Sequence, residues 1–246
     1  MNFLITGGSR GLGRQLVLDM VSAGHGVAFT FLQDEAAAHS VEDEARGRSP
    51  GANCRSFKLD QRVPMEVEEV CSTILDEFEE IDALINNAAV NRNGLAVSIS
   101  EDDWANVLDT NLSGPFYVSR QLLLHFLGQG HGRFIHISSV ASNGASGQIC
   151  YAASKAGLVG LSGTLAREYG RKGITSNVLV LGMLAGGMAD DDASARSRSV
   201  WNEMCPLRRE GHFSEVSDAV AYLASAGAAY VNGQEINLTG GMNWVP

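Results

Sequence analysis

Residues 3–13 read FLITGGSRGLG, a short apolar run that leads directly into a glycine-rich turn. Helical character begins at Leu12, so the turn joins a strand to a helix. Glycines let the backbone approach a pyrophosphate closely, and a helix N-terminus offers free N–H groups and the positive end of its dipole. The spacing is G-x-x-x-G-x-G, but its place after a first strand favours a dinucleotide site over glycines that merely turn the chain. The residues of this turn expected to contact the cofactor are Gly7, Ser9, Arg10, Gly11, Leu12 and Gly13.

The rest of the chain alternates short apolar runs with helix-like stretches. The runs expected to form strands are 2–6, 26–32, 53–59, 83–86, 133–138, 174–181 and 234–238. The stretches expected to form helices are 12–23, 35–46, 64–78, 101–127, 150–170 and 214–225. Such alternation indicates parallel strands joined by crossover helices, and strands that are apolar throughout indicate helices on both faces. We therefore predict an α/β fold with one Rossmann-type, doubly wound parallel sheet of about seven strands, in a single domain that spans residues 1–246.

Composition excludes several classes of protein. The net charge is −10 and the chain has no block of Lys or Arg, so we expect no nucleic-acid partner. The four cysteines lack C-x-x-C and zinc spacing, which predicts free thiols and no metal site. No apolar run approaches the roughly 18 residues of a membrane span, and the chain opens directly into a strand rather than a signal peptide. These features predict a cytoplasmic protein without a membrane partner.

The end of the second predicted strand bears on the choice of nicotinamide cofactor. An NAD site normally places Asp or Glu there, where the carboxylate accepts from the ribose 2′-hydroxyl. Here the strand ends Phe31-Leu32-Gln33, and Asp34 lies beyond the expected place. Arg10 could pair with a 2′-phosphate, although it could also be a solvated surface charge. The pattern favours NADP(H).

Four polar residues form a candidate catalytic group. Tyr151 and Lys155 are four residues apart at the start of a predicted helix and share one face, although an ordinary exposed pair would have the same spacing. Reduction of a carbonyl by hydride needs a proton, which a Tyr hydroxyl can supply when a nearby Lys ammonium favours the phenolate. Ser138 or Ser139, just past a strand, could polarise the substrate oxygen. Asn111, in the 101–127 stretch, could hold a water where the helix opens locally.

In this order and spacing, these motifs resemble the classical short-chain dehydrogenase/reductase family over essentially the whole chain. The matching residues are Thr6 to Gly13, Asp60, Asn86-Asn87-Ala88-Ala89, Asn111, Ser139, Tyr151 and Lys155. The resemblance implies a catalytic tetrad of Asn111, Ser139, Tyr151 and Lys155, with Ser139 favoured over Ser138. It also implies that Asp60 contacts the adenine region of the cofactor. The other residues that it places beside the cofactor are Asn87, Ala88, Tyr151, Lys155 and Leu184.

Within that family the chain is most similar to 3-oxoacyl-[acyl-carrier-protein] reductases. The similarity lies in Asn91-Arg92-Asn93-Gly94-Leu95, in Tyr151 to Leu158, and in the glycines near the C-terminal end. It implies NADPH-dependent reduction of a β-ketoacyl thioester, carried on a fatty-acid or polyketide carrier protein. It also implies a homotetramer that uses helices 101–127 and 150–170, with carrier docking near Arg171 and Lys172. The alternatives are a reductase or dehydrogenase of a free ketone or secondary alcohol, and a non-catalytic dinucleotide-binding sensor.

Several positions depart from the family pattern. Leu181 replaces a usual Pro, Gly186 stands where a cofactor-binding Thr is usual, and Gly130 stands where a basic residue often helps docking. These departures favour a specialised reductase over a housekeeping enzyme.

The stretch 183–212 lacks clear periodicity and is expected to be a substrate loop or lid. Ala185-Gly186-Gly187 would serve as a hinge and Asp190-Asp191-Asp192 as a solvated run. The residues that could offer an apolar face to an acyl chain are Val200, Trp201, Met204 and Leu207. The alternative is a fixed helix pair whose apolar residues complete the core.

Overall fold

The computed structural model describes residues 1–187 and 192–245, with the backbone alone for 192–196. Seven strands form one sheet in the order β3-β2-β1-β4-β5-β6-β7, and every neighbouring pair is parallel. The strands are β1 (Asn2–Ile5), β2 (Gly26–Phe31), β3 (Cys54–Lys58), β4 (Ala83–Asn86), β5 (Gly132–Ser139), β6 (Ile174–Leu181) and β7 (Glu235–Leu238). The predicted fold class is confirmed, and each predicted run matches its strand to within one residue at either end.

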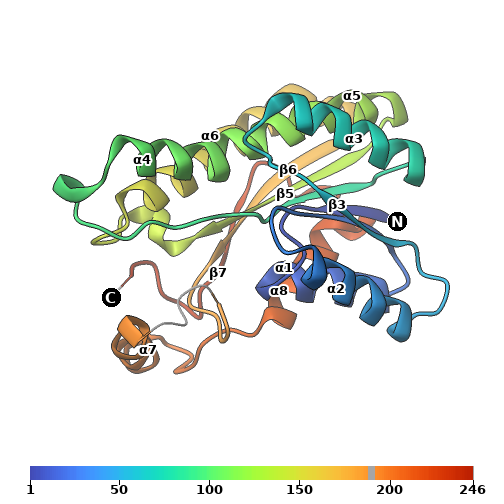
Figure 1. The fold of residues 1–246 in the computed structure, drawn as a ribbon. Helices are drawn as coiled ribbons and strands as arrows, with labels where there is room; N and C mark the ends of the chain where they lie inside the picture. The colour runs from blue at the N-terminus through green and yellow to red at the C-terminus, as the bar shows by residue number, and fades with distance from the viewer. Residues whose placement is uncertain (188–191, 246) are drawn as a thin grey trace.

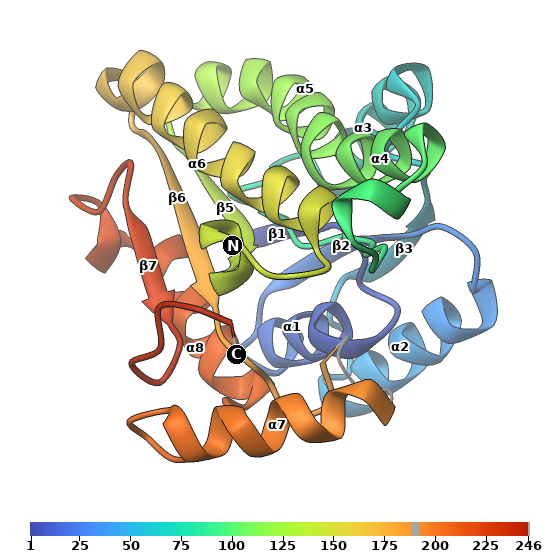
Figure 2. The same cartoon turned by 90° about the vertical axis from the view of Figure 1, so that its left-hand side faces the viewer.

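Helices cover both faces of the sheet, as Figures 1 and 2 show. One face carries α1 (Gly11–Ser22), α2 (Glu35–Arg48) and α8 (Phe213–Ala224). The other carries α3 (Pro64–Phe78), α4 (Glu101–Leu108), α5 (Gly114–Gln129) and α6 (Ile149–Tyr169). Short 3-10 turns occupy η1 (Ala96–Ser98), η3 (Val140–Asn143), η4 (Gly170–Lys172) and η5 (Ala226–Ala228).

The inner strands β1, β2 and β4 are largely apolar on both sides because each side meets a separate core, whereas the edge strands β3 and β7 carry exposed polar residues. In β1, Phe3 and Ile5 pack toward α1, α2 and α8, whereas Leu4 packs toward α3, α5 and α6. Successive side chains of a strand point to opposite faces, so a strand buried on both faces needs apolar residues at every position. This is why the strands of this chain appear as continuous apolar runs.

The stretch predicted as one helix over 101–127 is interrupted. It begins as α4, which is capped by the Ser100 side chain accepting from the Asp103 N–H at 3.0 Å. A π-helical turn, η2 (Asp109–Ser113), follows and leads into α5. Pro115 lies in the first turn of α5 and lacks an N–H group, so the regular bonding pattern cannot continue through this point.

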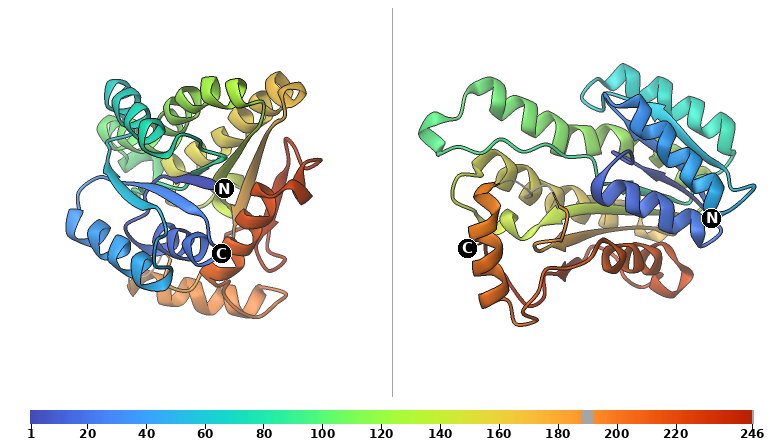
Figure 3. Two further views of the ribbon diagram at one scale, coloured as in Figure 1. Left: turned by 90° about the vertical axis from the view of Figure 1, so that its right-hand side faces the viewer. Right: turned by 60° about the horizontal axis from the view of Figure 1, so that its bottom comes forward.

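The stretch 183–212 contains a helix that periodicity did not predict, α7 (Asp192–Met204), which stands beside the C-terminal end of the chain (Figure 3). Trp201 is 2% exposed and belongs to a third apolar cluster, with residues of β6, Cys205 and Met242. Met204 and Leu207 remain 49% and 61% exposed. Trp201 therefore completes a core, as in the fixed-helix alternative, while these two side chains still face outward.

The predicted Asp190–Asp192 run lies outside the described residues, apart from the backbone of Asp192. All four cysteines are free, as predicted, and the structure shows that all four are buried. Among the described residues, none of the helices is both long and apolar enough to cross a bilayer.

The strand order places a crevice at one end of the sheet. The chain moves outward from β1 through β2 to β3, and then crosses back to place β4 on the other side of β1. In open α/β sheets, ligands bind outside the carboxyl ends of the strands at such a reversal. The glycine-rich turn follows β1 and the Asn87-Ala88 segment follows β4, so both line this crevice.

Candidate active site

The glycine-rich turn is folded so tightly that side chains are excluded at its contact points. Gly7 has a φ of +70°, a region that favours glycine. A Cβ built on Gly13 would lie 2.0 Å from the carbonyl oxygen of Gly7. These positions therefore require glycine, and the backbone surface that they leave bare is open to a diphosphate.

Thr6 and Asn87 fasten this turn to the end of β4. The Thr6 Oγ1 accepts from the backbone N–H groups of Asn87 and Ala88, each at 3.0 Å. The Asn87 Nδ2 donates to the carbonyl oxygens of Thr6 and Gly7 at 2.9 and 3.1 Å. Asn87 and Ala88 thus lie beside the glycine-rich turn, and the Asn87 amide is turned toward it.

The start of α1 presents an electropositive end to the crevice. Arg10 is the N-cap residue and makes no side-chain capping bond, and the first turn contains no acidic residue. The exposed Arg10 side chain forms no hydrogen bond or ion pair within residues 1–187 and 192–245. A helix N-terminus with an unpaired guanidinium beside it is suited to phosphate groups.

Two acidic residues near the predicted adenine-ribose region are already engaged. Asp34 caps α2 by accepting from the Ala37 N–H at 2.9 Å. The Asp60 carboxylate accepts from the Arg62 guanidinium at 2.6 and 2.9 Å, and hydrogen bonding by that side chain lowers the Asp60 pKa. Asp60 lies at the predicted edge, but a cofactor would share its carboxylate with Arg62.

Tyr151, Lys155 and Ser139 come together between the end of β5 and the first turns of α6. The Ser139 side chain lies beside Tyr151, and burial raises the pKa of Tyr151 to about 12, against a smaller opposing effect of Ser139. The Lys155 Nζ lies 5.5 Å from the centre of the Tyr151 ring and donates to the Ile137 carbonyl oxygen at 2.7 Å. Burial lowers the pKa of Lys155 to about 8.

The two adjacent serines have different surroundings. The Ser138 Oγ is buried and donates to the carbonyl oxygen of Lys155 at 3.0 Å, so it joins β5 to α6. The Ser139 Oγ instead lies beside Tyr151 and accepts from the Ala141 N–H at 3.2 Å. The geometry favours Ser139 as the hydroxyl that could meet a substrate.

Asn111 lies in the π-helical turn and ties it to neighbouring segments. Its Oδ1 accepts from the Val90 N–H at 2.9 Å, and its Nδ2 donates to the Val90 carbonyl at 2.8 Å. The same Nδ2 donates to the Ser154 Oγ at 3.1 Å. The residue four positions after Asn111 is Pro115, which lacks an N–H, so the Asn111 carbonyl has no donor at its usual helical position.

Sequence reasoning missed a buried polar network behind Lys155. His136 is fully buried in β5, between the Asn86 Nδ2 at 3.1 Å and the Ser176 Oγ at 3.2 Å. Because an amide NH₂ only donates, the His136 Nδ1 must accept, and the imidazole is neutral. Burial, and then the charge of Lys155, lower the His136 pKa to about 3. The signal available in the sequence was a single His inside an otherwise apolar strand.

The remaining predicted residues lie at two ends of the sheet. Leu184 follows β6 at the carboxyl end and pairs with Gly211, so it lies on the same side as the crevice. Arg171 and Lys172 precede β6 and lie at the amino ends of the strands, opposite Tyr151. Within one chain, these two basic residues are therefore separated from the candidate active site by the length of the sheet.

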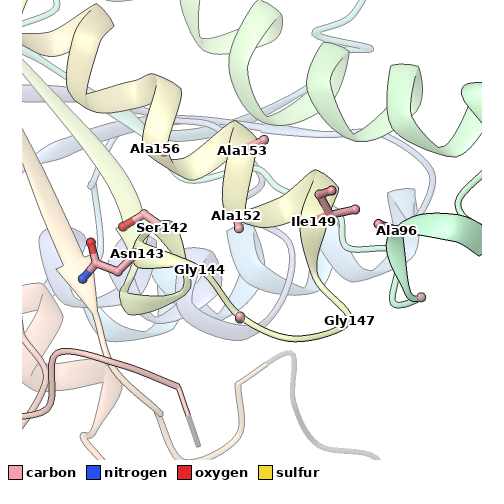
Figure 4. A pocket seen from close by; sticks show the side chains of 11 residues that line it. Ala96, Ser142, Asn143, Gly144, Gly147, Ile149, Ala152, Ala153 and Ala156 are labelled. Atoms are coloured by element: carbon pink, nitrogen blue, oxygen red, sulfur yellow. The ribbon is translucent and has the colours of Figure 1, made fainter.

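A hollow of about 530 Å³ lies beside the start of α6, as Figure 4 shows. It is lined mainly by small side chains of the loop after Ser139 and of α6, including Ser142, Gly144, Ile149, Ala152, Ala153 and Ala156. A helix turns by about 100° per residue, so Ala153 and Ala156 lie on the side of α6 away from Tyr151 and Lys155. This hollow adjoins the predicted subunit-contact face and is not the site of the tetrad.

The chain is similar to known proteins over nearly its whole length. A family model described as enoyl-(acyl carrier protein) reductase matches residues 7–243. The 3-oxoacyl-[acyl-carrier-protein] reductase FabG of Escherichia coli (strain K12) is 36% identical over 251 residues, covering 100% of both chains. The FabG protein of Staphylococcus epidermidis (strain ATCC 35984) is 34% identical and covers 97% of both. The crystal structure of levodione reductase superimposes with a TM-score of 0.92 at 27% identity, over 98% of this chain and 96% of that one.

Proposed function

Because this chain belongs to the short-chain dehydrogenase/reductase family of oxidoreductases, we propose that it is an NADPH-dependent reductase of β-ketoacyl thioesters. The observation that carries the proposal is the arrangement of Ser139, Tyr151 and Lys155 at the same end of the sheet as the glycine-rich turn. Curated relatives at 33–36% identity, which are named 3-oxoacyl-[acyl-carrier-protein] reductases, support the choice of substrate.

In the proposed reaction the substrate receives a hydride and a proton from two different groups. Bound NADPH supplies the hydride to the carbonyl carbon. The Ser139 hydroxyl holds the carbonyl oxygen, and the Tyr151 hydroxyl donates its proton to that oxygen as the negative charge develops. With pKa values of about 12 and about 8, Tyr151 and Lys155 both carry their protons near neutral pH. The Lys155 ammonium then stabilises the phenolate that Tyr151 leaves behind.

Asn111 would return the proton through water. Its carbonyl has no N–H donor at the fourth position because that residue is Pro115. A water held there would be able to pass a proton toward Lys155 and so restore Tyr151. In this scheme the Asn111 side chain fixes the turn while its carbonyl binds the water.

The residues present fit a dinucleotide and favour the 2′-phosphate of NADP(H). The diphosphate would bind against the bare backbone at Gly7 and Gly13 and at the N-terminus of α1. Arg10, which has no partner among the described residues, would bind the 2′-phosphate. Asp34 lies beyond the end of β2 and uses one carboxylate oxygen to cap α2, so β2 itself carries no carboxylate for the ribose of NAD.

We extend the proposal to a carrier-protein substrate of fatty-acid or polyketide type and to a homotetramer. Arg171 and Lys172 lie at the opposite end of the sheet from Tyr151. A carrier docked on them would therefore deliver its acyl group to the active site of a neighbouring copy. An assembly that pairs α4, α5 and α6 across subunits would place such a neighbour nearby.

A second candidate function is reduction of a free ketone or oxidation of a secondary alcohol. It is favoured by the close structural likeness to levodione reductase. The third hypothesis, a sensor without catalysis, gives no reason for Ser139, Tyr151 and Lys155 to lie together.

The decisive experiment follows NADPH oxidation with β-ketoacyl carrier protein, with β-ketoacyl N-acetylcysteamine, and with a panel of free ketones. Preference for the thioesters is expected, and preference for a free ketone would transfer the proposal to the second candidate. Tyr151→Phe should abolish turnover and preserve cofactor binding, because the ring remains and only the proton donor is lost. Activity of this variant above about 5% of the parent would contradict the assignment of the donor.

A further inference from the structure

The π-helical turn η2 leaves the Thr110 carbonyl, as well as that of Asn111, without its usual helical donor. The Gly114 N–H, which would normally bond to the Thr110 carbonyl, bonds instead to the carbonyl of Asp109. The next residue, Pro115, has no N–H to offer. The Thr110 carbonyl therefore needs a donor from outside its own helix, since an unpaired buried carbonyl is costly.

Gln61 supplies that donor. Its Nε2 donates to the Thr110 carbonyl oxygen at 2.6 Å and reaches the Ala88 carbonyl oxygen at 3.5 Å. Because both neighbours are acceptors, the nitrogen of the carboxamide must face them. The Oε1 is buried without a partner among the described residues, so the carboxamide is held through its nitrogen.

Gly114 makes the space for this side chain. Gln61 is only 6% exposed, and a Cβ built on Gly114 would lie 2.6 Å from the Gln61 Cγ. The contact joins the segment after β3 to the segment after β4 and to the start of α5. Gln61 is thus packed between the cofactor crevice and the turn that carries Asn111.

The turn is linked in the other direction to the proton donor. Asn111 Nδ2 donates to the Ser154 Oγ at 3.1 Å, and that hydroxyl donates to the Tyr151 carbonyl oxygen at 2.8 Å. Gln61 is therefore linked to the backbone of Tyr151 by hydrogen bonds on either side of the Thr110–Asn111 peptide bond.

We propose that Gln61 is a positioning residue whose buried carboxamide holds the π-helical turn, and thereby Asn111, in the geometry needed for turnover. The inference rests on the proposed function in so far as Asn111 and Tyr151 take part in proton transfer. It assigns to Gln61 no contact with substrate.

The test compares Gln61→Met with Gln129→Met. Methionine keeps the length and apolar bulk of glutamine and removes the amide. Gln129 is a matched control, because its Nε2 also donates to two carbonyl oxygens, those of Ile81 and His131 at 2.9 Å each, and its Oε1 is also unpaired. It lies at the end of α5, away from the π-helical turn.

Gln61→Met should lower kcat about tenfold, equivalent to about 1.4 kcal/mol in the barrier, with little change in KM or in the Kd for NADPH. In the free protein it should also speed hydrogen exchange of the amides in residues 109–114. Gln129→Met should do neither. Equal effects of the two variants on kcat and on this exchange would reduce Gln61 to a structural residue and overturn the proposal.

Gly114→Ala provides a second approach that retains Gln61. The added methyl group should displace the Gln61 side chain, lower kcat and speed exchange in the same segment. In a Gln61→Ala background, Gly114→Ala should lower kcat no further and should not speed exchange further, because the shortened side chain no longer meets the added methyl group. Additive losses would contradict the proposal. The exchange measurements need no substrate, so they remain decisive even if the proposed reaction fails the Tyr151→Phe test.

Discussion

Acid should destabilise this protein through His136. The folded chain holds this imidazole neutral, with its pKa lowered from 6.5 to about 3 by burial first and by the charge of Lys155 second. The unfolded chain titrates near 6.5 and so binds more protons between pH 6.5 and pH 3. The stability that His136 contributes is therefore fully present above pH 6.5 and is lost as the pH falls toward 3.

The size of the effect follows from that difference. Each pH unit within the window changes the free energy of unfolding by about 1.4 kcal/mol. Lowering the pH from 7 to 5 should therefore cost the protein about 2 kcal/mol through this one residue. Since His136 is fully buried between Asn86 and Ser176, solvent screening does not reduce this value.

Urea denaturation at pH 5, 6 and 7 would measure the effect. His136→Gln should lose most of the pH dependence over this range, whatever its stability at pH 7. His39→Gln, which changes an exposed histidine of α2, is the control and should keep the full dependence. The slope that His25 and His125 add is common to all three proteins, because burial lowers the pKa of both. If the free energy of unfolding changes equally with pH in His136→Gln and in the parent protein, the assignment of a neutral, buried imidazole is wrong.

Three further predictions concern the site and the segment after β6. Ser139→Ala should lower kcat/KM about 100-fold, whereas Ser138→Ala should lower it less than about tenfold, since the Ser138 hydroxyl bonds only to backbone. Steady-state kinetics would measure both values, and a larger loss for Ser138→Ala would reverse the assignment. Arg10→Ala should weaken the binding of NADPH at least about tenfold and the binding of NADH less than about twofold. Equal weakening of the two cofactors in fluorescence titrations would rule out a contact between Arg10 and the 2′-phosphate. Trp201→Ala should lower the free energy of unfolding, measured by urea denaturation, by about 3–5 kcal/mol, because this side chain is 2% exposed. An unchanged free energy of unfolding would favour the alternative in which Trp201 belongs to a substrate lid.

The strands and the glycine-rich turn could be predicted because local sequence determines them. A strand buried on both faces must be apolar throughout, and a turn with Gly13 packed on Gly7 tolerates no side chain. The grouping of Ser139 with Tyr151 and Lys155 could also be anticipated, since the carboxyl end of β5 and the start of α6 meet at one end of the sheet.

Other features depend on contacts between distant residues and left little local signal. Helix α7 is mostly polar, and its buried Trp201 is matched by residues of β6 and of the C-terminal segment. The π-helical turn needs Pro115 to remove one donor and Gln61 to replace it, although these residues are far apart in sequence. Neither pairing can be inferred from periodicity along the chain.

The central place of β1 also has a consequence for how the chain folds during synthesis. β1 precedes the other six strands of the described sheet in the sequence, yet one of its edges is completed only by Ala83–Ile85 of β4. The bonds from Thr6 to Asn87 and Ala88 close the glycine-rich turn at the same stage. A nascent chain that stops before Ala83 therefore leaves this edge of β1 open, which favours association with other chains. Maturation of the turn is a late, non-local event, and an amino-terminal fragment made only of the first two strands and helices should not capture a dinucleotide.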